Sequence, residues 1–260
     1  MQAACKKKHR TKHKKACERR VADIYDEKLF KEVEPDECPI CLIPLPHADQ
    51  TTTESCCGKR ICNGCVYAMF RSEGKALCPF CRSPTQISEE EHMKRIKKLI
   101  KKGNPEAYFL LAGSYYDGDL GMPQDHQKAR ELCLKAGELG CAAAYCSLGQ
   151  SYYDGRGVEV DKKKAKYYWE LAAMGGLAEP RYNLGCMEVI AGNHQRAMKH
   201  WIITAKSGHE KSLHNVKAGF VDGRFVAKDE YENTLRAYHG RHKEMKSDER
   251  EMAAASGIFG

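Results

Sequence analysis

The sequence predicts a small metal-stabilised module followed by an all-α solenoid of helical repeats. Two observations predict this fold class. Eight of the fourteen cysteines lie between residues 38 and 81, and a pattern of about 36 residues recurs over residues 105–240. The chain has 260 residues, of which 42% are apolar, so it is long enough for two domains with buried cores.

The positive charge of the chain is concentrated at its N-terminus. Residues 1–20 carry nine lysines and arginines against the single acid Glu18, an excess that equals the formal net charge of +8. We expect a disordered basic tail here. It could act as a nuclear import signal, as a nucleic-acid arm or only as a solvating segment. The remainder is balanced, so nucleic acid is not an expected partner of the body.

The composition favours a cytoplasmic or nuclear protein. The first residues lack the apolar stretch of a secretory signal, and no apolar run approaches the roughly 20 residues of a membrane span. We therefore expect no membrane association. In such a compartment thiols stay reduced, and clustered cysteines bind metal more often than they form disulfides.

The cysteine spacing fits two metal sites with four thiolates each. Three C-x2-C pairs are present, and the remaining two cysteines are adjacent in the sequence. Eight thiolates fill two tetrahedral Zn²⁺ sites, and metal binding would supply the folding free energy of a segment with few aliphatic residues. The eight candidate ligands are Cys38, Cys41, Cys56, Cys57, Cys62, Cys65, Cys78 and Cys81.

Residues 35–85 resemble a RING-type zinc finger. The matching motifs are "CPIC" at 38–41, "CGKRIC" at 57–62, "CNGC" at 62–65 and "CPFCRSP" at 78–84. The resemblance implies a small zinc-stabilised RING-like α+β module with a cross-brace, in which the first and third ligand pairs share one ion. By that resemblance the sites are Cys38, Cys41, Cys62 and Cys65 for the first ion, and Cys56, Cys57, Cys78 and Cys81 for the second.

The module departs from the common RING pattern at one ligand. Lys59 occupies the place of the usual histidine, and a protonated lysine is no zinc ligand. All-cysteine RING variants place a cysteine at the spacing of Cys57, which leaves Cys56 as the adjacent ligand. In the alternative, one cysteine of the doublet is spare and His47 or a water completes the site. PHD and LIM modules expect a histidine, and the doublet breaks the FYVE pattern.

The RING resemblance implies a ubiquitin-protein transferase without a covalent intermediate. RING fingers bind a ubiquitin-conjugating enzyme that carries ubiquitin as a thioester. Ile40 and Pro79 match the apolar contacts for that enzyme, and Arg82 matches the basic residue that bridges enzyme and ubiquitin. In the plainer interpretation, Ile40 packs a small core and Arg82 is a surface residue. The alternative function is a non-enzymatic zinc-binding adaptor or scaffold, and a third hypothesis is a nucleic-acid-associated factor.

The repeats are visible as matched strings. "LAGSYYDG" at 111–118 matches "LGQSYYDG" at 148–155, and a third copy spans 184–208. A degenerate fourth copy begins near residue 216. Trp169 and Trp201 take equivalent places in copies two and three, whereas Cys133 takes that place in copy one. Each copy predicts two helices joined by a turn, and stacking of several copies buries a continuous core.

Residues 105–240 resemble the Sel-one-like repeat, a relative of the tetratricopeptide repeat. The resemblance rests on the L-G/A-x-x-Y-x-x-G opening of copies one and two, the K-A before each second helix and the W-x-x-x-A-x-x-G ending of copies two and three. It implies a concave surface that recruits protein substrate. The expected organisation is a tail at 1–20, a connector at 21–34, the zinc finger at 35–85, a helical connector at 88–102 that caps the solenoid, repeats at 103–250 and a disordered tail at 251–260.

Cysteines and histidines outside the cluster show no ligand spacing. The repeat cysteines are expected to be small buried hydrophobes, and the scattered histidines of the repeats are expected at the surface. These residues are Cys133, Cys141, Cys146, Cys186, His194, His200, His209 and His214.

Overall fold

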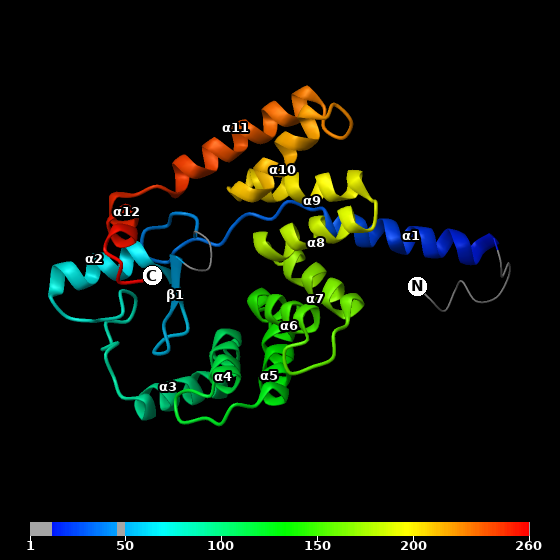
Figure 1. The fold of residues 1–260 in the computed structure, drawn as a ribbon. Coiled ribbons are helices and arrows are strands. Elements are labelled where there is room, and N and C mark those ends of the chain that lie inside the picture. The colour runs from blue at the N-terminus through cyan, green and yellow to red at the C-terminus, as the bar shows by residue number, and fades with distance from the viewer. Residues whose placement is uncertain (1–11, 46–49, 260) are drawn as a thin grey trace.

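The computed structural model describes residues 12–45 and 50–259, and Figure 1 shows a helical protein with a small hairpin-containing module near its N-terminus. The elements are α1 (Lys12–Leu29), β1 (Thr51–Thr53), β2 (Arg60–Cys62), α2 (Asn63–Glu73), α3 (Glu89–Lys101), α4 (Pro105–Asp117), α5 (His126–Glu138), α6 (Ala142–Asp154), α7 (Lys162–Met174), α8 (Ala178–Ile190), α9 (His194–Lys206), α10 (Glu210–Val221), α11 (Lys228–Met245) and α12 (Asp248–Ala255). Among the described residues, no helix is both long and apolar enough to cross a membrane.

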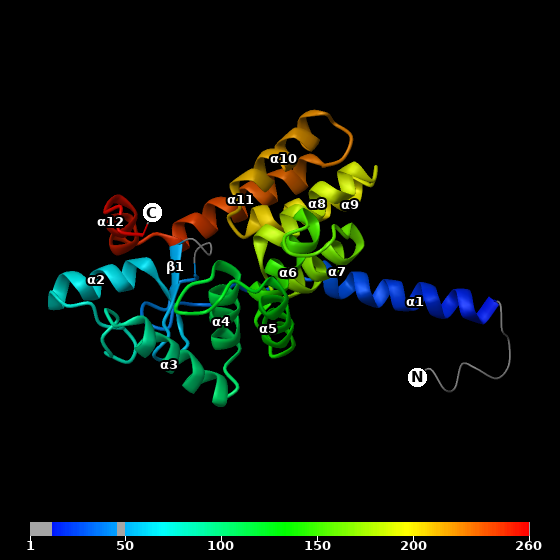
Figure 2. The ribbon, with the colours of Figure 1, turned by 60° about the horizontal axis from the view of Figure 1, so that its bottom comes forward.

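Helices α4 to α11 form the solenoid as four successive helical pairs (Figure 2). Local sequence defines their ends. The Asp125 and Asp161 side chains accept hydrogen bonds from backbone N–H groups in the first turns of α5 and α7. Gly118 and Gly155 end α4 and α6 with φ of 75° and 76°, a conformation that glycine adopts without a steric penalty. The predicted helical-repeat solenoid is confirmed.

The segment expected as a helical connector forms α3. The Ser88 hydroxyl accepts a hydrogen bond from the Glu91 N–H at its start. Met93, Ile96 and Leu99 are buried on one face, and Ile96 and Leu99 form a core cluster with Ala107 of α4. Helix α3 therefore covers the first end of the solenoid.

Within the described residues, part of each segment predicted as a disordered tail is helical. Residues 12–20 lie within α1, because this lysine- and arginine-rich stretch consists mostly of good helix formers. Residues 1–11 lie outside the described part of the chain. Near the C-terminus, residues 248–255 form α12, which packs against α2 and buries Ala253. That tertiary contact orders the segment. It also places α12 beside the cysteine-rich module of residues 35–85 (Figure 1).

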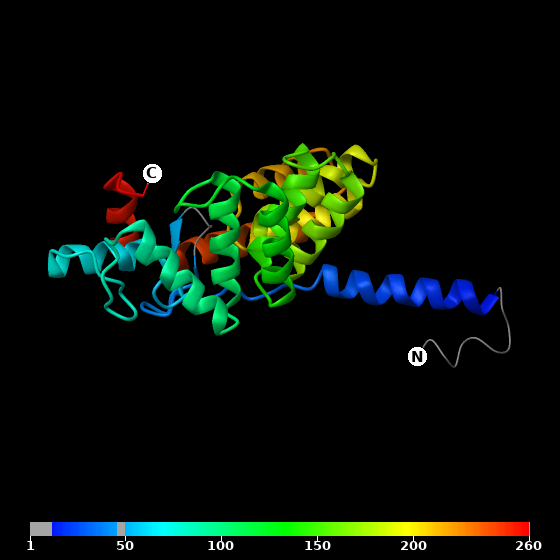
Figure 3. The same ribbon diagram turned by 90° about the horizontal axis from the view of Figure 1, so that it is seen from below.

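The last turns of α1 pack across the seam between repeats two and three, while the helix extends away from the solenoid (Figure 3). Leu29 is fully buried in a cluster with Trp169 and Leu184. The buried Arg181 guanidinium donates to the carbonyl oxygens of Leu29 and Ala173. The segment expected as a connector at 21–34 is thus an integral part of the solenoid's packing.

Two of the histidines expected at the surface are buried. His209 is 6% exposed, and His200 is fully buried. Neither ring nitrogen of His200 has a hydrogen-bond partner among the described residues. The His200 ring packs 4.7 Å from the Phe30 ring, measured between centroids. Contact with Phe30, directly after α1, therefore helps to shield the His200 side chain from water. The sequence of the repeat that contains His200 could not predict this burial.

We expect burial of His200 to make the fold acid-sensitive. Burial first, and then the charges of Arg181 and Arg196, lower its pKa from 6.5 to about 3. Below pH 6.5 the unfolded chain binds a proton that the folded chain excludes, so this stabilisation is lost progressively as the pH falls toward 3. Between pH 7.5 and 5.5 the free energy of unfolding should fall by about 1.4 kcal/mol more in the wild type than in His200→Leu.

Denaturant titrations at the two pH values measure that difference. The exposed His214 provides the matched control, because His214→Leu should keep the wild-type pH response. An identical pH response of the wild type and His200→Leu would contradict the prediction.

Candidate metal centre

The fold gathers the eight clustered cysteines into two groups of four. Within each group the sulfur atoms all lie within 4.8 Å of one another. The groups interleave along the sequence, as the cross-brace expectation requires, and both members of the doublet fall in the second group. His47, the alternative ligand, lies outside the described residues. The groups are Cys38, Cys41, Cys62 and Cys65, and Cys56, Cys57, Cys78 and Cys81.

Three of the sulfur–sulfur separations match a tetrahedral metal site. In the first group the Cys38–Cys65 and Cys41–Cys62 sulfur pairs are each 3.8 Å apart. Zinc–sulfur bonds of about 2.3 Å in a regular tetrahedron place the sulfurs about 3.8 Å apart. In the second group one pair is 3.8 Å apart and the Cys56–Cys81 pair is 3.2 Å apart. A disulfide needs about 2.05 Å, and these cysteines are free thiols.

Two matching turns supply the outer ligand pairs. In the first turn, the Cys38 N–H donates to the Ile43 carbonyl oxygen at 3.0 Å, and the Leu42 N–H donates to the Cys38 carbonyl oxygen at 2.9 Å. In the second, the Arg82 N–H donates to the Cys78 carbonyl oxygen at 2.8 Å. Leu42 and Arg82, each directly after a pair, have φ of 57° and 58°. The two segments share the sequence C-P-x-C-x-x-P, and both adopt the same backbone conformation.

The hairpin and α2 supply the inner ligands. Strands β1 and β2 pair antiparallel with Thr51 opposite Cys62, and α2 starts directly after Cys62, so Cys65 lies in its first turn. The doublet lies in the turn between the strands. There Gly58, with φ of 67°, approaches Asn104 at the start of α4 so closely that an added Cβ would lie 2.6 Å from the Asn104 side chain. The second site therefore lies beside the first repeat.

The environment of the thiols differs between the two groups. Burial raises the pKa of Cys57 to about 12 and also raises the pKa of Cys56. Without a cation, such thiols stay protonated at neutral pH. In the first group, hydrogen bonding from Cys65 and from Arg250 lowers the pKa of Cys62 to about 4. A divalent cation bound in each group would stabilise the thiolate form of the four sulfurs around it.

The donor set indicates the metal. Four sulfur donors in tetrahedral arrangement favour Zn²⁺ over the hard cations that prefer oxygen. Four protein ligands also leave no open position for water or substrate, so each site would serve structure rather than hydrolysis.

Arg250 of α12 contacts the first group from the far end of the sequence. Its guanidinium donates to the Pro44 carbonyl oxygen at 2.9 Å, to the Ile43 carbonyl oxygen at 3.3 Å and to the Cys41 sulfur at 3.7 Å. An added Cβ at Gly64 would lie 2.7 Å from its side chain. Sequence reasoning missed this residue because no local pattern links positions 209 residues apart.

The residues expected to contact a conjugating enzyme lie around the two turns. Ile40 is 40% exposed, and Pro79 is half-buried. Arg82 is an exposed side chain that forms an ion pair with Glu73 at the end of α2, with 2.6 Å between nitrogen and oxygen. Lys59, in the place of the usual histidine, is exposed and lies 5.7 Å from the centre of the Phe80 ring.

The comparisons with known proteins bear on the repeats. The Sel1 repeat family matches residues 105–141 and 142–177. The chain is 30% identical over 115 residues to the "ERAD-associated E3 ubiquitin-protein ligase component HRD3B" of Arabidopsis thaliana. That match covers 43% of this chain but only 18% of the relative's length.

Two solved structures are similar to this chain. A Sel1 repeat protein from Oxalobacter formigenes is 27% identical, with a TM-score of 0.44 over 48% of this chain and 97% of that one. The antigen c5321 of uropathogenic Escherichia coli, described as displaying an SLR fold, is 22% identical, with a TM-score of 0.50 over 68% of this chain and 36% of that one.

Fold and sequence together define a helical-repeat protein with two four-cysteine groups suited to metal. Its repeats at 105–141 and 142–177 are Sel1 repeats, a class of repeat that mediates protein–protein interaction.

Proposed function

We propose that residues 35–85 form a RING-type zinc finger and that the chain is an E3 ubiquitin ligase of the cytoplasm or nucleus. The observation that carries this proposal is the interleaving of the two cysteine groups, together with the exposed Ile40 between the first two candidate ligands. The Arabidopsis relative, which is named as a ubiquitin ligase component, supports a role in the same pathway.

In the proposed reaction the zinc finger acts by positioning. Ile40 and Pro79 would contact a ubiquitin-conjugating enzyme, and Arg82 would bridge that enzyme and its bound ubiquitin. Holding the thioester in one orientation near a substrate lysine lowers the entropic part of the barrier. Glu73 fixes one edge of the Arg82 guanidinium, and the remaining N–H groups stay free for the bridge. The Sel1 repeats would hold the protein substrate.

Ubiquitin transfer to the chain itself tests this proposal. Purified protein, incubated with a panel of conjugating enzymes, should form ubiquitin chains and contain two zinc ions. Ile40→Ala and Arg82→Ala should each lower the initial rate about tenfold or more, because each removes a contact made with the conjugating enzyme or its ubiquitin. Both variants should retain two zinc ions.

Ile190 offers a matched control, because it is 80% exposed on a repeat. Ile190→Ala should transfer ubiquitin at the wild-type rate. Two zinc ions with no transfer from any conjugating enzyme would contradict the ligase proposal. That result would favour the alternative of a zinc-binding adaptor, for which the Arg82–Glu73 ion pair would have only a structural role.

A further inference from the structure

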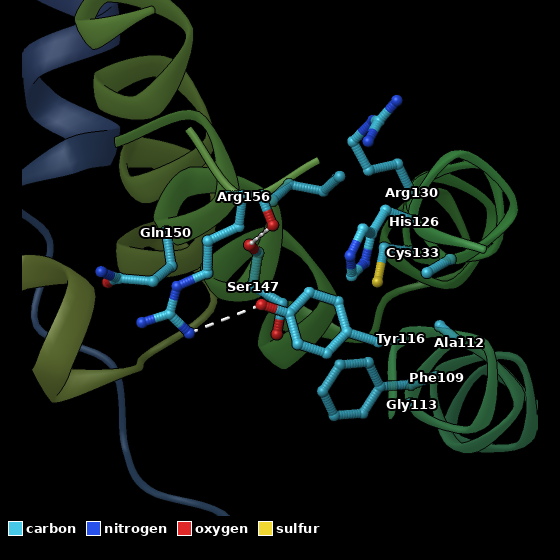
Figure 4. Close-up of a pocket in the computed structure, with 13 residues that line it drawn as sticks. Phe109, Ala112, Gly113, Tyr116, His126, Arg130, Cys133, Ser147, Gln150 and Arg156 are labelled. Atoms are coloured by element: carbon cyan, nitrogen blue, oxygen red, sulfur yellow. Dashed lines mark hydrogen bonds between the residues drawn. The ribbon is translucent and has the colours of Figure 1, made fainter. Parts of the chain in front are cut away.

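A cavity of about 220 Å³ lies where the first repeat meets the second. It lies between α4, α5 and α6 and is bordered by the loop that follows α6 (Figure 4). Phe109, Cys133 and Leu148 contribute apolar walls, and Figure 4 shows Tyr116, His126 and Arg156 around the same space. The cavity is smaller than the 300–1,000 Å³ of common small-molecule pockets, so it suits a single amino-acid residue.

The cavity exists because the first repeat lacks a tryptophan. In repeat two the Trp169 ring packs so close to Gly149 that an added Cβ there would lie 2.3 Å from the ring, and Trp201 packs on Gly185 in the same way at 2.4 Å. The equivalent position of repeat one is Cys133, a much smaller side chain. The space that the indole ring fills in repeats two and three is therefore left open in repeat one.

Two basic side chains of the cavity, His126 and Arg130, are only partly paired among the described residues. The His126 Nδ1 atom is buried and has no hydrogen-bond partner in the described structure. Arg130 is half-buried and donates to the Gly157 carbonyl oxygen, but it has no carboxylate partner among the described residues. Arg156 donates to the Tyr116 hydroxyl at 3.5 Å, while its charge is paired with Asp154 at 3.2 Å. Arg130 therefore leaves the cavity with an unbalanced positive charge.

These features require a ligand that joins an apolar group to an anion. We propose that the cavity binds the C-terminal residue of a peptide, with a large apolar side chain against Phe109 and Leu148 and the free carboxylate at Arg130. The C-terminal residue of a peptide carries an apolar side chain and a free carboxylate together. An internal acidic residue lacks this combination, and the peptide chain would also have to enter and leave the cavity on either side of it. The His126 Nδ1 atom gains a polar neighbour when the cavity is filled.

This inference deepens the proposed function, because it rests on the repeats as the substrate-binding part and names the substrate class as proteins with an apolar C-terminal residue. It requires no ubiquitin transfer, so its test is independent of ligase activity.

Fluorescence polarisation of the full chain tests the proposal. The probe is a fluorescein-labelled five-residue peptide that ends in phenylalanine, prepared with a free carboxylate and with a carboxamide. The free acid should bind about tenfold more tightly, as expected for one charge-assisted hydrogen bond. Arg130→Gln should abolish this preference, and Arg224→Gln, which changes an exposed arginine of the α10–α11 loop, should preserve it.

A second variant fills the cavity and keeps the fold. Ala112 occupies the place of Gly149, so the pair Ala112→Gly and Cys133→Trp rebuilds the packing of repeat two inside repeat one. This variant should keep the wild-type circular dichroism and melting temperature but lose peptide binding. Equal binding of acid and amide, or retained binding by the filled variant, would each overturn the assignment.

Discussion

Chelation of the zinc that we propose for the two cysteine groups is expected to unfold residues 35–85 while the helical repeats stay folded. The core of this module consists almost entirely of candidate metal ligands, because Ile61 is the one buried residue of its cluster that is not a cysteine. Without metal, little apolar surface is left to balance the entropy of ordering the chain. Structural zinc sites contribute on the order of 10 kcal/mol to folding, more than packing around Ile61 provides.

Cysteine substitution and hydrogen exchange measure this effect. Cys38→Ser should lower the zinc content from two ions per chain to one or fewer, and amide protection within 35–85 should fall to that of the chelated protein. Cys186→Ser is the matched control, because Cys186 is a partly buried repeat cysteine outside both groups. It should retain both ions. Two zinc ions in Cys38→Ser, or unchanged protection of 35–85 after chelation, would contradict the prediction.

The parts that sequence predicted are those that local spacing defines. Each C-x2-C pair and the doublet bring two sulfurs close together through local sequence alone. Once a cross-brace is assumed, the division of the eight cysteines into two groups follows. The repeats are equally local, because each copy carries its own glycine turns and its own alanine and tyrosine positions. The absence of tryptophan at Cys133 was visible in the sequence, but its consequence, a cavity, needed the helices to be placed.

The parts that sequence missed depend on contacts between distant segments. The contact between Arg250 and Cys41 spans 209 residues, and the burial of His200 depends on Phe30 from a segment read as a polar connector. Helix α12 is short and polar in composition, and its order follows from its contact with α2. Helical propensity alone could have indicated α1, because its lysines, arginines and alanines all favour the helix.

Gly185→Ala is expected to destabilise the solenoid although alanine is the better helix former. The added Cβ would lie 2.4 Å from the Trp201 Nε1 atom, and that nitrogen donates to the Tyr182 carbonyl oxygen at 3.2 Å. Trp201 is 7% exposed, so its ring has little room to move. Overpacking costs about 1–3 kcal/mol, and the strained hydrogen bond adds about 1 kcal/mol. After the gain in helix propensity, the free energy of unfolding should fall by about 2 kcal/mol.

Gly113→Ala should act in the opposite direction. Gly113 also lies within a helix, α4, but an added Cβ there meets no atom within 4 Å, so only the propensity gain of up to about 1 kcal/mol remains. Denaturant titration of both variants measures the contrast. Stabilisation by Gly185→Ala would show that the Trp201 ring moves freely. The repeats would then not need a glycine opposite each tryptophan, and the open space beside Cys133 would lose its physical explanation.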